Sequence, residues 1–225
     1  MRMQTIVRRT RPIDAMLLVD KPAGITSHDV VSVARRALGE RRIGHAGTLD
    51  PFATGLLLLL SGRATKLAPR LVGLDKRYLT TIDLTATTTT GDPEGDVLER
   101  HEPPATLDLD RLRGEIELPV PAASAVKIGG ERAYKLHRRG VEVEMPLRRS
   151  IVHELDVVDR DATTVTLDLR VSSGTYVRAI AQALGGHCRT LRRTAVGPFS
   201  VEDAVPPESF EPGCLLDEVE VLAAL

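Results

Sequence analysis

Tryptophan is absent from this sequence of 225 residues, and aromatic residues make up only 3% of it. Cysteine is nearly absent: Cys188 and Cys214 stand alone, without paired Cys or His spacing. The sequence therefore supports neither a disulfide framework nor a zinc site, and it fits a reducing cytoplasm.

Long apolar runs are also missing. The longest aliphatic run covers residues 56–60, whereas a helix that spans a bilayer needs about 20 apolar residues. The N-terminus has basic residues but no apolar stretch after them, so no export signal is indicated. We predict a globular cytoplasmic protein without membrane contact, because a hydrophobic content of 42% is enough to bury a core.

A general excess of positive charge is the third feature that is lacking, since the formal net charge is -1. The charges are nevertheless segregated along the chain. Residues 124–149 hold seven Lys or Arg against three acids, whereas residues 199–225 hold seven acids and no Lys or Arg. One face of the protein can therefore still be basic and attract a polyanion.

Apolar patterning predicts a strand over residues 15–20 and an amphipathic helix that Ser27 caps and Gly39 stops. A glycine-punctuated loop follows, and residues 56–60 predict a buried strand. Further along, Gly129-Gly130 predicts a hairpin-like basic arm that ends at Gly140. The remaining segments predicted as regular structure are strands at 76–90, 151–158 and 163–172, and a helix at 177–184. This mixture indicates an α+β fold on a mainly antiparallel mixed sheet with flanking helices.

Asp50 is the first candidate for chemistry, because it is the only carboxylate between Gly44 and Gly55. Pro51 favours an extended backbone at Asp50, and the glycines permit another chain to approach closely. The alternative is that Asp50 only makes a turn or caps a helix. A glycosidase would require a second carboxylate about 5–10 Å away, for which the sequence offers no obvious candidate.

A metal site is not expected. Asp92, Glu94 and Asp96 could mimic a calcium loop, but the ligand required at its far end is missing.

The three tyrosines, Tyr78, Tyr134 and Tyr176, all lie beside Lys or Arg. Aromatic rings stack on unpaired bases while neighbouring cations hold phosphates, so this pattern favours recognition of looped RNA. Each tyrosine taken separately could equally be an amphipathic residue at a strand edge.

Six ordered motifs within residues 15–200 resemble the TruB family of tRNA pseudouridine-55 synthases. The central one is Gly44-His45-Ala46-Gly47-Thr48-Leu49-Asp50-Pro51-Phe52-Ala53-Thr54-Gly55. The others are Leu18-Val19-Asp20-Lys21-Pro22-Ala23-Gly24, Asp75-Lys76-Arg77-Tyr78, Ser124-Ala125-Val126-Lys127 with the Gly-Gly-Glu-Arg-Ala-Tyr after it, Ser173-Gly174-Thr175-Tyr176-Val177-Arg178 and Leu191-Arg192-Arg193. Ala46 departs from the family, which commonly has a hydroxyl residue there.

The resemblance implies a pseudouridine synthase fold and the isomerisation of uridine 55 in the tRNA T loop, without cofactor or metal. The base would be flipped out, released from C1′ at N1 and rejoined through C5. Asp50 would be the essential carboxylate, Tyr78 would stack on the uracil and help to remove the C5 proton, and Arg178 would pair with Asp50 and keep it ionised.

The resemblance also implies a set of substrate-binding residues. His45 would fill the space that the flipped base leaves, Tyr176 and Leu191 would line the uracil pocket, and Lys21 would bind substrate or only shape the loop. Lys127 belongs to the segment, residues 124–149, that corresponds to the family's thumb-like insertion over the RNA stem-loop.

One catalytic domain over residues 1–225 is expected, without the C-terminal RNA-binding PUA domain of many family members. We therefore expect a monomer that acts without guide RNA. Two alternatives remain: a tRNA-binding or tRNA-folding module without turnover, and a hydrolase that releases free base. Asp50 argues against a pure binder, because its charge would repel RNA unless Arg178 compensates it.

Overall fold

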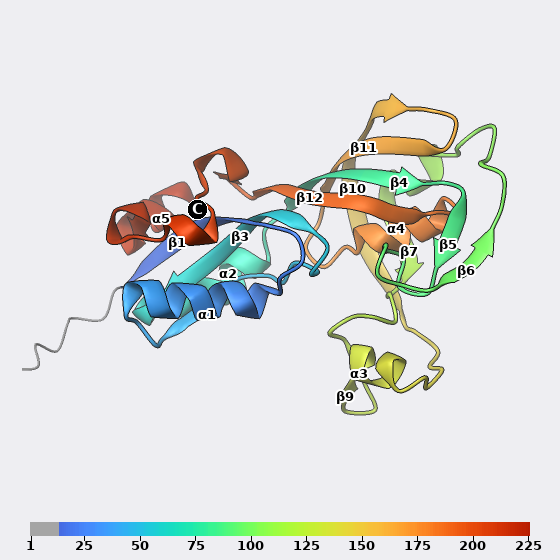
Figure 1. Cartoon of the computed structure of the whole chain (residues 1–225). Helices are drawn as coiled ribbons and strands as arrows, with labels where there is room; N and C mark the ends of the chain where they lie inside the picture. The colour runs from blue at the N-terminus through green and yellow to red at the C-terminus, as the bar shows by residue number, and fades with distance from the viewer. Residues whose placement is uncertain (1–13) are drawn as a thin grey trace, which may run out of the picture.

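A ten-stranded sheet runs through the whole molecule in the order β14-β1-β3-β12-β4-β11-β10-β7, with β2 paired to β3 and β13 to β12 (Figure 1). The computed structural model describes residues 14–225, so the basic N-terminus, residues 1–13, lies outside the described residues. Every strand pair in this sheet is antiparallel except β3 with β12. The expected α+β fold on a mainly antiparallel mixed sheet is confirmed.

The N-terminal half of the sheet has an apolar cluster on each face. Its strands are β1 (Ala15–Lys21), β2 (Ile43–His45), β3 (Thr54–Ser61) and β14 (Leu215–Asp217). Because side chains alternate along a strand, Leu57 and Leu59 pack toward α1 (Ser27–Leu38), whereas Leu56, Leu58 and Leu60 pack toward α2 (Ala68–Val72) and α5 (Glu218–Ala224). The residue 56–60 strand is therefore buried on both sides, as predicted.

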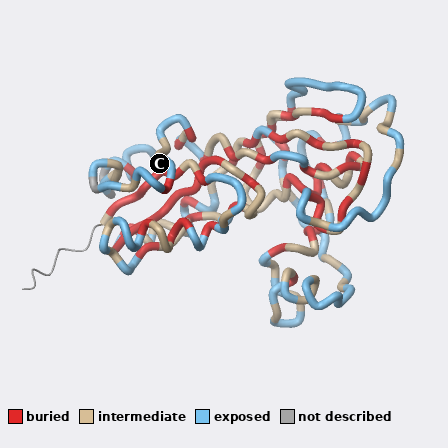
Figure 2. The backbone as a smooth tube through the Cα atoms, viewed as in Figure 1, coloured by how far each residue is buried: buried red, intermediate tan, exposed pale blue. Residues whose placement is uncertain are grey.

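The C-terminal half is a curved antiparallel layer with α4 (Val177–Ala183) against its inner face. Its strands are β4 (Lys76–Asp83), β7 (Gly114–Pro119), β10 (Leu147–Arg160), β11 (Thr164–Val171), β12 (His187–Val196) and β13 (Phe199–Ser200). Buried positions alternate along β4 and along most of β11 (Figure 2). A separate hairpin, β5 (Ala86–Thr88) with β6 (Val97–Arg100), lies beside them.

The arm predicted around Gly129-Gly130 is confirmed as a small lobe that hangs from the sheet (Figure 1). The two glycines turn the hairpin of β8 (Lys127–Ile128) and β9 (Glu131–Arg132), and α3 (Ala133–Arg138) follows. We call residues 124–149 the thumb segment.

The short 3₁₀ helices are η1 (Gly62–Leu67), η2 (Asp110–Leu112), η3 (Val201–Asp203), η4 (Pro207–Ser209) and η5 (Pro212–Cys214).

Two local predictions are wrong. Thr26, not Ser27, caps α1: its side chain accepts from the Asp29 amide at 3.1 Å, and Asp29 completes a capping box. The Ser27 hydroxyl instead accepts from the Leu49 amide at 2.9 Å and donates to the Leu49 carbonyl at 3.1 Å. The strand predicted over residues 76–90 is two strands, β4 and β5, separated at Leu84 and Thr85.

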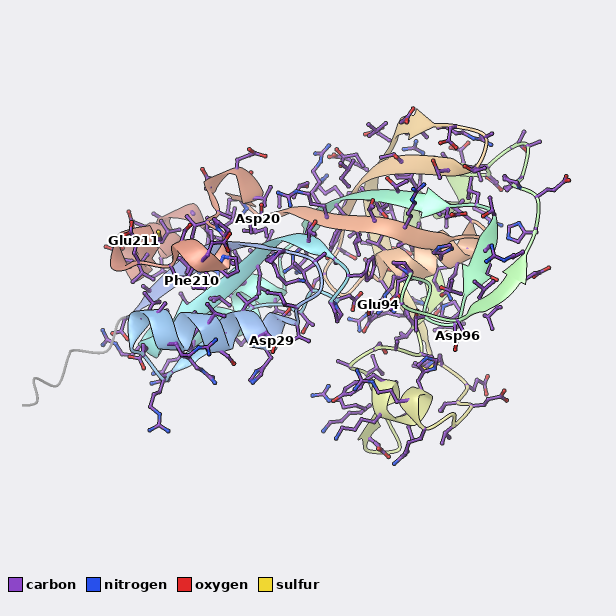
Figure 3. All side chains as sticks on the ribbon, in the orientation of Figure 1. Asp20, Asp29, Glu94, Asp96, Phe210 and Glu211 are labelled. Atoms are coloured by element: carbon purple, nitrogen blue, oxygen red, sulfur yellow. The ribbon has the colours of Figure 1, made fainter. Side chains whose placement is uncertain are left out.

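The N-terminal end of α1, marked by Asp29 in Figure 3, points toward the junction of the two halves. There β3 and β12 form a short parallel pairing of Thr54 with Arg192 and Gly55 with Arg193. Gly55 has φ +99°, and a Cβ atom on it would lie 2.2 Å from the Arg193 carbonyl oxygen. The junction therefore requires a glycine at this position.

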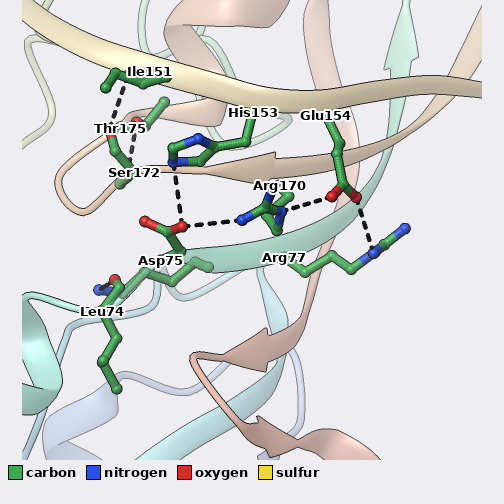
Figure 4. Close-up of polar contacts among 10 residues, drawn as sticks. Leu74, Asp75, Arg77, Ile151, His153, Glu154, Arg170, Ser172 and Thr175 are labelled. Atoms are coloured by element: carbon green, nitrogen blue, oxygen red, sulfur yellow. Dashed lines mark hydrogen bonds and ion pairs between the residues drawn. The ribbon is translucent and has the colours of Figure 1, made fainter. Parts of the chain in front are cut away.

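The outer face of the C-terminal half carries a chain of ion pairs (Figure 4). Arg170 lies between Glu154 at 2.8 Å and Asp75 at 3.3 Å, and Glu154 also pairs with Arg77 at 3.2 Å. These side chains are about 40% exposed, and such pairs contribute about 0–1 kcal/mol each. The opposite face of the same strands is the one that lies toward the candidate site.

Gly55→Ala should lower the free energy of unfolding by about 2–4 kcal/mol, because it adds a clash with rigid backbone to the cost of a positive φ. Urea unfolding followed by circular dichroism measures the loss. Gly114→Ala is the matched control, since Gly114 has φ +73° but open space around its Cβ position. Equal losses in the two variants would contradict a requirement for close approach at the junction.

Candidate active site

Asp50 lies in the loop of residues 46–53, which connects β2 to β3 beside the junction of the sheet. Hydrogen bonds hold this loop to the segment before α1: the Gly24 amide donates to the Pro51 carbonyl at 2.8 Å, and Ser27 binds Leu49. The Asp50 carbonyl accepts from the Ala53 amide at 3.1 Å, which closes a turn. The glycine-rich loop is thus fixed in place, and the Asp50 side chain remains 33% exposed.

Arg178, in the first turn of α4, binds Asp50 with two nitrogens. Nε lies 2.9 Å from Oδ2 and Nη2 lies 3.2 Å from Oδ1 of Asp50. The Arg178 side chain is only 3% exposed. The structure therefore brings together the two residues, 128 positions apart, that were expected to pair, and this fork geometry fits a carboxylate.

Asp92 completes the ion cluster, and sequence reasoning missed this role. Its Oδ2 lies 3.2 Å from Arg178 Nη1, and its Oδ1 accepts from the Thr90 hydroxyl at 2.5 Å and the Glu94 amide at 3.0 Å. At 5% side-chain exposure Asp92 is closed off from solvent, so it anchors Arg178 rather than offering a second reactive carboxylate. Its turn context held no signal for this pairing, which requires α4 to lie alongside.

The remaining Arg178 donors bind backbone. Nη1 donates to the Thr90 carbonyl at 2.7 Å and Nη2 to the Ala123 carbonyl at 3.0 Å. One guanidinium therefore joins the Asp50 loop, the turn after β5 and the base of the thumb segment.

Burial raises the pKa of Asp50, and the nearby Asp92 charge adds to that rise. Arg178 is the main opposing influence, and Lys21 assists it. The ion pair with Arg178 is therefore what favours the ionised carboxylate in this partly dehydrated place.

Lys21, at the end of β1, is completely buried. Its ammonium donates to the carbonyls of Pro22 at 2.8 Å, Ile25 at 2.9 Å and Pro51 at 3.2 Å. Burial lowers the pKa of Lys21 to about 8. The ammonium makes three hydrogen bonds to backbone carbonyls, one of them in the Asp50 loop, which agrees with the loop-shaping role, one of the two expected for Lys21.

Tyr78 and Leu191 lie on the inner face of the sheet and belong to one apolar cluster with Leu49 and Ala53 of the loop. In the register of β4 with β12, Tyr78 is opposite Arg193 and Leu191 is opposite Thr80, so the two side chains share a face. Tyr78 is 9% and Leu191 7% exposed. We call these two side chains the inner-face wall; their apolar cluster also contains two residues of the loop.

The other three expected site residues lie on different elements: β2, the start of α4 and the thumb segment. His45 ends β2, and its Nδ1 is buried without a hydrogen-bond partner among the described residues. Burial lowers the pKa of His45, and Arg193 and His28 lower it further. Tyr176 is half-buried and caps α4 two residues before Arg178. Lys127 is exposed on β8 of the thumb segment.

In the described part of the chain, no group of three or more His, Cys, Asp and Glu is placed to hold a metal ion. Among the same residues, no helix is long and apolar enough to cross a membrane.

A carboxylate that is paired with a buried guanidinium and still partly exposed can stabilise positive charge or attack an electron-poor carbon of a substrate. The fold is similar to that of a solved structure titled "Crystal structure of pseudouridylate synthase", at 19% identity and a TM-score of 0.51, over 96% of this chain and 75% of that one. This similarity shows that the two proteins share a fold.

The family follows from sequence comparison. The family model described as "TruB family pseudouridylate synthase (N terminal domain)" matches residues 35–177. The chain is 48% identical to the tRNA pseudouridine synthase B of Mycobacterium sp. (strain KMS), over 87% of this chain and 71% of that protein. It is 45% identical to the protein of that name from Leifsonia xyli, over 89% and 73%. The chain belongs to the TruB family of pseudouridylate synthases, which are isomerases.

A more distant solved relative is Cbf5, in the structure titled "Crystal Structure of a Cbf5-Nop10-Gar1 Complex". The identity is 27% and the TM-score 0.63, over 85% of this chain and 52% of that one. The chain thus spans about half the length of Cbf5.

Arg178→Met should move the acid limb of the pH profile of kcat/KM to higher pH. Removing the cation raises the pKa of Asp50 further, so a smaller fraction is ionised at neutral pH, and we expect kcat/KM at pH 7 to fall at least about 100-fold. Rates of pseudouridine formation between pH 5 and 9 provide the measurement. Arg170→Met, which removes an arginine from the ion pairs of the outer face, should change kcat/KM less than about twofold. An acid limb that stays in place in Arg178→Met would contradict the role of this pair.

Proposed function

We propose that this enzyme converts uridine 55 in the T loop of tRNA to pseudouridine, with Asp50 as its essential carboxylate. The observation that carries the proposal is that Asp50, in a glycine-rich loop, pairs with the buried Arg178 of α4. Two relatives that are 45–48% identical to this chain over the aligned residues are named tRNA pseudouridine synthase B. These names support tRNA as the substrate.

The reaction requires that one glycosidic bond is exchanged for another. The uridine is flipped out of the loop, at a cost of a few kcal/mol that contacts in the site offset. The N1–C1′ bond then breaks, the base turns, and a C5–C1′ bond forms. The C5 hydrogen leaves as a proton and N1 takes up a proton, so the product is an isomer and no cofactor is consumed. Asp50 stabilises or attacks the group released by cleavage.

The inner-face wall of Tyr78 and Leu191 suits a flat base. Tyr78 would stack on the flipped uracil, and its hydroxyl would help to remove the C5 proton, while Leu191 and Tyr176 would line the pocket. Stacking on an aromatic face is worth about 1–3 kcal/mol per base. His45, whose pKa is lowered mainly by burial, would occupy the space that the base leaves.

The thumb segment would close over the T stem-loop. It carries seven Lys or Arg against three acids, and Lys127 is exposed on its first strand. We propose that residues 1–225 form one catalytic domain with this segment as an insertion. We also propose a monomeric, cytoplasmic enzyme that acts without guide RNA. The higher identity to proteins named as tRNA enzymes than to Cbf5 supports tRNA as its substrate.

Tritium release tests the function directly. The substrate is an unmodified tRNA transcript that carries 5-tritiated uridine, because forming the C5–C1′ bond expels that hydrogen. Wild type should release tritium, and Asp50→Asn should reduce release by at least about 1,000-fold through loss of the negative charge.

A transcript with cytidine in place of uridine 55 is the control for position, and it should release no tritium. Binding of tRNA without release by wild type would overturn the proposal and favour a binding module. Release of free uracil would favour a hydrolase.

The thumb contact predicts a dependence on salt. If Lys127 binds a phosphate, Lys127→Gln should reduce the slope of log K against log salt by about 0.7–0.9, which is the value for one contact. Fluorescence anisotropy with a labelled T stem-loop between 50 and 300 mM salt provides the slope. Lys66→Gln, at the end of η1, is the control. A slope in Lys127→Gln equal to that of wild type would remove Lys127 from the interface.

A further inference from the structure

Arg193 is the largest fully buried side chain in the described part of the chain, at 1% exposure. Its guanidinium binds three backbone carbonyls: Nε donates to Leu56 at 2.7 Å, Nη2 to Gly47 at 3.2 Å and Nη1 to Thr48 at 3.4 Å. Lys and Arg are almost never fully buried unless they are paired. The full burial of this charged side chain therefore requires an explanation.

The three carbonyls lie at the two ends of the loop that presents Asp50. Gly47 and Thr48 precede Asp50 by three and two residues, and Leu56 is the third residue of β3, after the loop. A single side chain from β12, about 140 residues further along the chain, thus joins the entry of the loop to its exit. The close approach of Gly55 to the Arg193 backbone strengthens the same connection.

Nothing acidic accounts for the burial of this charge. Within residues 14–225, Arg193 forms no ion pair, and its charge is balanced by carbonyl dipoles alone. Arg192, the adjacent residue, shows the contrast: it pairs with Asp20 through two contacts of 2.9 and 2.8 Å and is 37% exposed. A long apolar side chain would fill the Arg193 space without the cost of dehydrating a charge.

We propose that Arg193 is a positioning residue for Asp50, which holds the two ends of the catalytic loop at the spacing that places the carboxylate at the reacting uridine. The assignment rests on the proposed role of Asp50 in pseudouridine formation. Arg178 fixes the direction of the carboxylate, whereas Arg193 fixes the backbone from which it extends. Both arginines are needed, because a displacement of the reacting carboxylate by about 1 Å can lower a rate about 100-fold.

Arg193 also sets the electrostatic surroundings of His45 on the strand that leads into the loop. Burial is the main cause that lowers the pKa of His45, and the charges of Arg193 on β12 and His28 on α1 lower it further. Removing the Arg193 charge should therefore raise the pKa of His45, whereas a lysine at this position should preserve most of the effect. This gives a readout that a loss of packing alone would not produce.

Three variants test the proposal: Arg193→Lys, Arg193→Met and the neighbouring control Arg192→Gln. Arg193→Lys keeps the charge but loses the fork that reaches both loop ends. We expect it to fold, to bind tRNA within about twofold of wild type, and to lose about 10- to 100-fold in kcat. Arg193→Met should lose more in kcat, and Arg192→Gln should retain kcat within about twofold.

Two further measurements need no substrate, so they remain informative if the proposed function fails. Amide hydrogen exchange in residues 46–55 should be faster in both Arg193 variants than in Arg192→Gln. NMR titration of the His45 ring should show a higher pKa in Arg193→Met and a nearly unchanged one in Arg193→Lys.

Full kcat in Arg193→Lys, or unchanged loop exchange in both Arg193 variants, would overturn the proposal. A lower melting temperature with unchanged kcat would do the same, because it would assign Arg193 to stability alone. Absence of tritium release from wild type would instead count against the proposed function, while faster loop exchange would still support the positioning role.

Discussion

The ion cluster around Arg178 is the interaction on which the rest of the site depends. A guanidinium that is 3% exposed requires compensation, and removal of one partner of such a buried pair costs about 3–5 kcal/mol. Asp50 and Asp92 supply the charge, and the carbonyls of Thr90 and Ala123 complete the donors. Three chain segments must therefore meet at α4 before Asp50 can be both ionised and exposed to a substrate.

The sheet junction explains why this meeting occurs where it does. Only two residue pairs join β3 to β12, so the continuous sheet is narrowest there, and the loop, the inner-face wall and α4 all reach this place. Arg193 lies at the same junction and binds both ends of the loop. The charged outer face, by contrast, is made of exposed pairs that contribute little individually, so the two faces of the same strands serve different purposes.

Much of the local structure could be predicted, because apolar alternation and glycine positions act over short range. The residue 56–60 strand, the helix after Ser27 and the hairpin at Gly129-Gly130 were all expected. The pairing of Asp50 with Arg178, 128 positions apart, was expected only from the family resemblance. The Ser27 cap was wrong because a neighbouring threonine offered the better capping box, which left Ser27 free to bind Leu49. Asp92 and Arg193 were missed because their partners are distant in sequence.

The amino-acid sequence by itself determined the fold class, the positions of several strands and helices and, through its motifs, the candidate residues Asp50, Tyr78 and Arg178. Only the tertiary structure decided that Lys21 is engaged by backbone, that Asp92 anchors Arg178, and that Arg193 joins the loop ends. The physical reason is that periodicity and turn chemistry depend on neighbouring residues, whereas the partner of a buried charge is set by which distant segments pack together.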